Sequence, residues 1–291
     1  MFALTLILAV FIGITLGLLG GGGSILTVPL LAYVAGMEPK EAIATSLLVV
    51  GVTSAVGAIS HARAGRVRWR TGLIFGLAGM VGAYGGGVLS TFIPGTVLLI
   101  AFAVVMVATA IPMLRGRREV QAGAAARRLP VLKVIAQGLA VGLVTGMIGA
   151  GGGFLVVPAL ALLGGLPMPV AVGTSLIVIA MNSFAGLAGH LFSVAVDWPV
   201  ALGVTAAAVA GALVGARLTA LISPDVLRRA FGWFVLVMAS VILAQEIHPV
   251  VGAVAGGATA LAAVMAWTCA RRGLCPLRWL SHVWPGPNAP A

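Results

Sequence analysis

The sequence predicts an all-α polytopic membrane protein of two inverted-topology repeats, with broken or re-entrant helices at two glycine clusters and one extra C-terminal apolar helix. Composition is the first reason: 61% of the residues are hydrophobic and 8% are charged, against about 25% charged in soluble domains. The second reason is an internal duplication. The third is that a run of glycines interrupts a strongly apolar segment in each half, at 17–31 and at 149–160.

Long apolar runs mark the expected membrane spans, because a helix needs about 20 such residues to cross a bilayer. They lie at 2–19, 42–62, 71–91, 97–114, 131–148, 171–192, 199–222, 230–246 and 250–270. Shorter runs at 24–36 and 153–165 follow the glycine clusters, and each is expected to form a half-helix or one arm of a hairpin. The first ten residues lack the positive charge that begins a signal peptide, so the N-terminus is expected to be retained.

The duplication is visible when the sequence is aligned with itself without gaps, because one constant offset places Pro29 on Pro158 and His61 on His190. We call this pairing the repeat register. It also aligns Gly20 with Gly149, Gly22 with Gly151, Gly23 with Gly152, Thr45-Ser46 with Thr174-Ser175, Trp69 with Trp198 and Gly86 with Gly215. We therefore expect a first transmembrane repeat at 1–114, a basic cytoplasmic linker at 115–130 and a second repeat at 131–246. An extra transmembrane helix at 247–270 and a cytoplasmic tail at 271–291 complete the predicted organisation.

The distribution of arginine indicates that the repeats are inverted. The loop from Arg63 to Arg70 holds four arginines, whereas its equivalent at 193–198 has no basic residue. In the next pair the uncharged loop is 91–96 and its equivalent ends in Arg228 and Arg229. Cytoplasmic loops are enriched in Lys and Arg, so we expect a multi-pass protein of the bacterial inner membrane with the linker and the C-terminus inside. Lys40, on a predicted outer loop, is the exception.

The glycine clusters predict a binding site. Matched Gly/Pro-interrupted segments in inverted repeats are typical of secondary transporters that bind substrate near the bilayer midplane. Glycine admits a ligand close to the backbone, and helix starts at Ser24 and Gly153 would offer N–H donors to an anion. The alternative is that the glycines only allow close helix packing. The expected binding residues at the breaks are Gly20, Gly22, Gly23, Ser24, Gly149, Gly151, Gly152 and Gly153.

Other polar residues of the spans have two interpretations each. The hydroxyls of the two Thr-Ser pairs either bind an oxyanion or bond to their own helix. A mid-span amide, aligned with Thr53, either binds substrate or bridges helices. Histidines at the span ends could gate, relay protons or draw in anions, or they could anchor the helices at the interface. These residues are Thr45, Ser46, Thr174, Ser175, Asn182, His61 and His190.

The motifs GGGGSILTVPLL, AIATSLL and SHARAGRVRWR, with GAGGGFLVVPAL, AVGTSLI and GHLFSVAVDW in the second half, resemble those of the TauE/SafE family. The resemblance covers roughly residues 5–245. It implies a membrane permease, with export of sulfite or sulfoacetate-like anions as the activity for which the family is named. The second half departs from the family pattern where Val194 or Ala195 replaces a glycine, which leaves the turn of that loop open.

Several classes of function are disfavoured. No Asp or Glu lies mid-span, which argues against coupling through a buried carboxylate, and no nucleotide-binding or catalytic motif supports an enzyme. No cofactor is expected. Two histidines without acids or thiolates make a poor metal site, and Cys269 and Cys275, expected in the cytoplasm, imply no disulfide framework. The net charge of +11 reflects topology and not nucleic-acid binding.

The expected function is therefore a secondary transporter for a small anion, with that anion and the lipid bilayer as its partners. An anion-selective channel and a non-transporting membrane anchor or assembly protein are the alternatives. Substrate identity, transport direction, coupling ion and homo-oligomer formation are left open by the sequence.

Overall fold

A computed structural model describes residues 2–19, 22–114, 131–149, 152–158, 160, 166, 168–218, 224–247 and 254–259. Within these ranges every regular element is helical, which confirms the predicted all-α class. The α-helices are α1 (Phe2–Leu19), α2 (Thr27–Pro29), α3 (Pro39–Arg63), α4 (Trp69–Ser90), α5 (Gly95–Leu114), α6 (Val131–Ile148), α7 (Gly153–Pro158), α8 (Met168–His190), α9 (Trp198–Leu218) and α10 (Pro224–Glu246).

Eight of the nine long apolar runs coincide with one of these helices. In the described part of the chain, four helices are long and apolar enough to cross a membrane: α3, α4, α8 and α9. The repeat register relates α3 to α8 and α4 to α9. The apolar stretches of α1, α5, α6 and α10 are shorter. Of the expected extra helix, residues 254–259 are helical, and the basic linker, the C-terminal tail and both cysteines lie outside the described residues.

Both glycine clusters interrupt the helices, although they do so differently. After α1 the chain forms a 3₁₀-helix, η1 (Gly22–Leu26), then α2, then a π-helix, η2 (Leu30–Val34). After α6 the backbone turns at Gly149 and Gly152, whose φ angles are +79° and +78°, before α7 begins at Gly153. Glycine adopts such angles without steric cost. The expected start at Gly153 is thus observed, whereas Ser24 lies inside a 3₁₀-helix that begins at Gly22.

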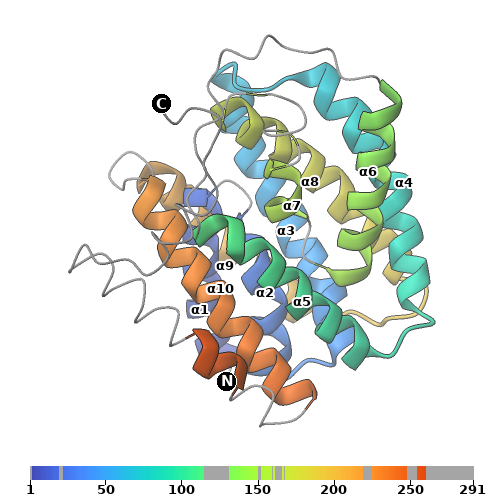
Figure 1. The fold of residues 1–291 in the computed structure, drawn as a ribbon, viewed down its shortest axis with the longest axis vertical. Coiled ribbons are helices and arrows are strands. Elements are labelled where there is room, and N and C mark those ends of the chain that lie inside the picture. Colours follow the sequence, from blue (N-terminus) through green and yellow to red (C-terminus); the bar gives the residue numbers. More distant parts are fainter. Residues whose placement is uncertain are drawn as a thin grey trace, which may run out of the picture.

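Two long helices, α3 and α8, occupy the centre of the molecule (Figure 1). They cross in opposite directions: Gly51 lies against Ser183 and Phe184, whereas Gly57 lies against Leu176. On one side α4 packs against α6 and α8, and on the other α9 packs against α1 and α3. Helices α5 and α10 pack together (Figure 1). The two breaks also meet, because η1 contacts α7.

Glycines allow the backbones of α1 and α9, and of α4 and α6, to touch. At each of these glycines a Cβ atom would overlap a carbonyl oxygen of the facing helix. Each contact in one pair has its counterpart in the other in the repeat register. The equivalent contacts are Gly13 to Ala208 with Gly142 to Gly79, Gly17 to Ala212 with Gly146 to Ala83, Gly211 to Val10 with Gly82 to Leu139, and Gly215 to Ile14 with Gly86 to Leu143.

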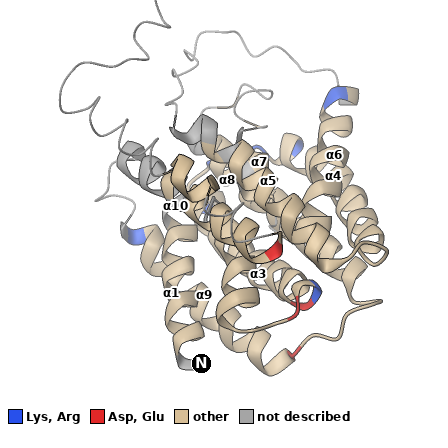
Figure 2. Ribbon diagram, turned by 60° about the horizontal axis from the view of Figure 1, so that its bottom comes forward, with Lys and Arg blue, Asp and Glu red and all other residues tan. Residues whose placement is uncertain are grey.

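Within the described ranges, charged residues lie at helix ends and in loops, and the spans carry none in their middle (Figure 2). We refer to the two ends of the bundle as the His61 end and the His190 end, since α3 and α8 finish at those residues. The His61 end carries Arg63, Arg66, Arg68, Arg70, Lys133 and Arg217, and the His190 end carries Glu38, Lys40, Glu41, Asp197 and Glu246. Lys40 donates a hydrogen bond from Nζ to the Thr91 carbonyl oxygen at 2.9 Å, which gives this charge a partner at the end of α4.

Substitution of Gly142 by Ala should destabilise the protein, because the new Cβ would meet the Gly79 carbonyl. Overpacking of this kind costs about 1–3 kcal/mol. The matched control is Gly85→Ala in α4, because no described atom outside that helix turn lies within 4 Å of a Cβ built on Gly85. Thermal unfolding of the purified variants in detergent measures the difference; equal melting temperatures would contradict the proposed packing.

Candidate functional site

The second glycine break is tied to the central helix α3. Ser46 Oγ contacts the carbonyl oxygen of Gly149 and lies 3.0 Å from the carbonyl oxygen of Ile43. A Cβ on Gly149 would also collide with the backbone of Ile43. Ser46 is fully buried. Its hydroxyl therefore joins the break to α3, which is the structural alternative to direct ligand binding.

The other three hydroxyls of the Thr-Ser pairs differ in their partners. Ser175 Oγ donates to the Val172 carbonyl oxygen at 2.8 Å, the equivalent of the Ser46 bond to Ile43. Thr174 Oγ1 accepts a hydrogen bond from the Arg68 N–H at 3.0 Å. Thr45 Oγ1 is buried without a partner among the described residues. In the repeat register, Asp197 corresponds to Arg68 and Thr45 to Thr174. The N–H of Asp197 donates to Glu41 Oε1 at 3.3 Å and not to Thr45.

The half-helices at the breaks are short. Helix α7 has six residues and η1 has five, so neither accumulates the dipole of a long helix. The N–H groups of Leu155 and Val156 bond to the Gly152 carbonyl oxygen at 2.9 and 2.8 Å. Gly22, Gly23 and Ser24 belong to η1, and Gly20 and Gly151 lie outside the described residues. The expected anion site at two facing helix starts stays a prediction.

A group of buried polar side chains lies where α3 and α8 cross. Asn182 is 1% exposed, and neither its Oδ1 nor its Nδ2 has a hydrogen-bond partner in the described structure. Its carboxamide faces Gly79 of α4, where any larger residue would collide with it. Ser54 and Ser183 are fully buried, and their hydroxyls also lack partners there. Thr53, by contrast, bonds to the Val49 carbonyl oxygen at 2.6 Å.

Ser54 and Ser183 are the residues that the sequence interpretation missed. They are equivalent in the repeat register, as are their neighbours Thr53 and Asn182. The register therefore contained the signal. It was hidden because a serine in an apolar helix ordinarily bonds to its own backbone, and only the structure shows that these two do not.

The two histidines occupy different environments. His190 is fully buried: its Nε2 lies 2.9 Å from the Gly146 carbonyl oxygen, and its Nδ1 lies 3.1 Å from Ser90 Oγ. Because a carbonyl only accepts, Nε2 carries a hydrogen. Ser90 Oγ also reaches the Gly87 carbonyl oxygen at 2.6 Å, so its single hydrogen can serve either acceptor. This arrangement accommodates both the neutral and the protonated imidazole.

His61, in contrast, is half-buried, and its Nδ1 has no partner in the described structure. The structure does not bring the two histidines together, because they end antiparallel helices. It places them at opposite ends of the bundle, in agreement with their expected positions at the two ends of the spans.

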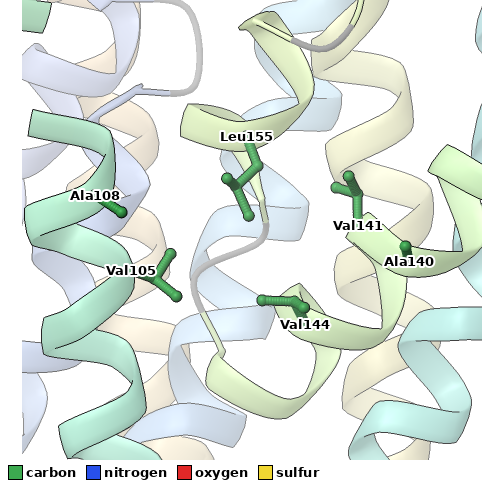
Figure 3. Close-up of a pocket in the computed structure, with 6 residues that line it drawn as sticks. All are labelled: Val105, Ala108, Ala140, Val141, Val144 and Leu155. Atoms are coloured by element: carbon green, nitrogen blue, oxygen red, sulfur yellow. The ribbon is translucent and has the colours of Figure 1, made fainter. Parts of the chain in front are cut away.

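An open, shallow pocket of about 330 Å³ lies between α5, α6 and α7 (Figure 3). Its lining is apolar throughout: Val105, Ala108, Ala140, Val141, Val144 and Leu155. Such a lining offers no hydrogen bond to an anion. It does leave space beside the half-helix α7, whose Leu155 points into it (Figure 3). Among the described residues, no group of three His, Cys, Asp or Glu side chains could hold a metal ion.

Comparison with known sequences assigns the family. The profile described as "Sulfite exporter TauE/SafE" matches residues 5–242. The chain belongs to the TauE/SafE family. It is 37% identical over 238 residues to a "Probable membrane transporter protein" of Xylella fastidiosa, covering 78% of this chain and 89% of the relative. Two Bacillus subtilis proteins with the same description, YunE and YdhB, are 31% and 28% identical, covering 76% and 77% of this chain and 88% and 94% of the relatives.

Membership in this family, together with the apolar helices, identifies a multi-pass membrane transporter. The resemblance inferred from the glycine, Thr-Ser and histidine motifs is thereby confirmed. No solved structure matches the chain.

Substitution of Ser46 by Ala should loosen the second glycine break, because it removes the hydroxyl that bonds to Gly149. A buried acceptor left without its donor costs about 1–3 kcal/mol. Hydrogen exchange of residues 146–153 should accelerate and the melting temperature should fall. Ser60→Ala is the control, since Ser60 is exposed and bonds only within its own helix, to Gly57. Unchanged exchange in the Ser46 variant would show that the break does not depend on this bond.

Proposed function

We propose that the protein is a permease for a small oxyanion, such as sulfite or an organosulfonate, that exports it across the bacterial inner membrane. The observation that carries this proposal is the Asn182 side chain midway along α8, whose amide has no hydrogen-bond partner among the described residues. In hydrocarbon an unsatisfied polar group is costly and tends to be functional. A ligand that hydrogen-bonds to the carboxamide in the course of transport removes that cost.

The surroundings of Asn182 suit a small ligand that crosses between the repeats. On the crossing helices, Ser54 and Ser183 offer two further hydroxyls that have no partner in the described part of the chain. Helix α7 packs against α8 and against η1, so the glycine breaks lie on the elements next to this crossing. An amide N–H and two O–H groups can donate hydrogen bonds to the oxygen atoms of an oxyanion. We therefore propose Asn182, Ser54 and Ser183 as the centre of the anion path, flanked by the expected residues at the breaks.

The distribution of charge favours one orientation of the protein in the membrane. Apart from the first two turns of α10, where Asp225, Arg228 and Arg229 lie, the described residues of the His61 end include six basic residues and no acid, whereas four acids and Lys40 lie at the His190 end. The enrichment of Lys and Arg on the cytoplasmic side favours a cytoplasmic His61 end. Basic side chains there would gather the anion from the cytoplasm. Each negative charge that leaves gains about 2.3 kcal/mol from an inside-negative potential of about 100 mV, so export needs no coupling ion.

Substitution of Asn182 by Leu should strongly reduce anion flux without lowering stability. Leucine has the same number and branching of side-chain heavy atoms as asparagine, and replacement of a polar group that has no partner among the described residues by an apolar group of the same shape is nearly neutral or stabilising. We expect sulfite efflux from proteoliposomes to fall by about tenfold or more, the loss that about 1.4 kcal/mol of binding free energy produces. Thr53→Val, at the equivalent position, is the control because the Thr53 hydroxyl is already satisfied within its helix. Normal efflux from a folded Asn182→Leu protein would exclude this site.

The driving force and the carrier mechanism can be tested together. An imposed potential of about 100 mV should sustain about a 50-fold gradient of a monovalent anion, the ratio that corresponds to about 2.3 kcal/mol per charge. Proteoliposomes with a valinomycin-set potassium potential measure this gradient. A carrier also shows saturation and counterflow, whereas a channel shows neither. Flux that ignores the potential would contradict uncoupled anion export.

A further inference from the structure

The two central helices are equivalent in sequence, but their C-terminal halves are packed unequally. In α8 a Cβ on Gly186 would lie 3.3 Å from the Cα of Gly146 in α6 and 3.6 Å from the Ala83 carbonyl oxygen in α4. At the equivalent Gly57 of α3, only Leu176 lies within 4 Å among the described residues. Gly17 and Ala212, the counterparts of Gly146 and Ala83, therefore do not lie within 4 Å of a Cβ on Gly57.

The same inequality extends to the helix ends. Gly189 packs against the backbone of Gly87, and both are buried, whereas their equivalents Ser60 and Ala216 are exposed. Phe192, just beyond α8, packs edge-on against Tyr84 of α4 with a centroid distance of 6.4 Å, a favourable aromatic geometry. The His190 end is thus closed between α8, α4 and α6, whereas at the His61 end the described residues of α3 pack less closely against α9 and α1.

His190 joins the elements that form the closed end. From α8 it bonds to Gly146 in the last turn of α6 and to Ser90 in the last turn of α4. Gly146 lies three residues before the Gly149 turn, so this bond also reaches the backbone that leads into the second break. His61 makes no equivalent bond through Nδ1 to any described residue, and Thr219, the counterpart of Ser90, lies outside the described residues.

We propose that His61 and His190 are reciprocal positioning residues of the transport cycle: His190 closes one end in the state described here, and His61 closes the other in the opposite state by bonding to the Gly17 carbonyl oxygen. Gly17 is assigned because the repeat register relates it to Gly146. In that opposite state α8 leaves α4 and α6, and His190 takes the half-exposed environment that His61 has now. The inference rests on the proposed permease function for its purpose, but its geometry does not depend on the substrate.

We expect the two states of the protein to have similar energies, because the flanking pairs α1–α9 and α4–α6 make equivalent contacts in the repeat register. Only the central helices need to exchange their packing. A substrate bound to both central helices at their crossing is compatible with either state. Each histidine, in contrast, stabilises only the state in which its own end is closed. Loss of one histidine should therefore shift the population toward the state that the other histidine closes.

Cysteine accessibility tests this exchange. Reporters are the equivalent substitutions Ala185→Cys, at a position that is 9% exposed, and Val56→Cys, at one that is partly buried, in a chain with Cys269→Ser and Cys275→Ser. The full chain is placed in nanodiscs, where a charged, membrane-impermeant thiol reagent reaches both faces. We expect His190→Ala to raise the labelling rate of Ala185→Cys by about tenfold, the population change expected for the loss of about one buried hydrogen bond, and to lower that of Val56→Cys.

The converse variant should act with the opposite sign: His61→Ala lowers the labelling of Ala185→Cys further. His190→Gln, which keeps an N–H donor, should restore closure. If both reporters gain accessibility together, or if neither responds to either histidine, the proposal is wrong and His190 has only a structural role. Ser90→Ala, a smaller change at the same closed end, should shift the reporters in the direction of His190→Ala and decides the matter if that variant does not fold.

These readouts need no substrate. A reciprocal shift of the reporters without sulfite flux would support the roles of the two histidines and contradict sulfite as the substrate. Sulfite flux that depends on Asn182, without a reciprocal shift, would support the proposed function and contradict the roles of the histidines.

Discussion

Close backbone contact between helices is the constraint on which the rest of the structure depends. Helices α1 and α9, and likewise α4 and α6, approach until any side chain larger than hydrogen would collide with the facing carbonyl groups. In a bilayer apolar side chains gain little by leaving lipid, so association depends on such close packing. The two tight pairs hold the flanks of the bundle and leave the central helices α3 and α8 between them.

The central helices carry the features that a transporter requires. Their crossing contains polar groups without partners among the described residues, and their ends carry histidines in unequal environments. The same helix α3 holds the second glycine break through Ser46. A movement of α3 or α8 would therefore reach the break, the crossing and one end of the bundle together, which is the coupling that a carrier needs between its binding site and its access path.

Glycine has two distinct roles in this chain. At Gly149 and Gly152 the backbone has positive φ angles, and glycine is needed for conformation. At Gly13, Gly142 and their partners the backbone is regular helix, and glycine is needed for proximity. The sequence interpretation offered packing as the alternative to a binding role for the clusters, and the structure shows packing mainly at the glycines within the helices.

The sequence by itself determined the membrane class, the family and most helix positions, because apolar runs, glycine punctuation and the repeat register are local or periodic signals. It also placed Asn182, His61 and His190 as residues to examine. Only the tertiary structure decided which hydroxyls are satisfied. Ser46 and Thr174 have partners that are distant in the sequence, whereas Ser54 and Ser183 have none among the described residues. It likewise decided that the described residues pack more closely at one end than at the other. Two halves of related sequence favour equivalent contacts, so a difference between them arises from the conformational state that the folded chain adopts.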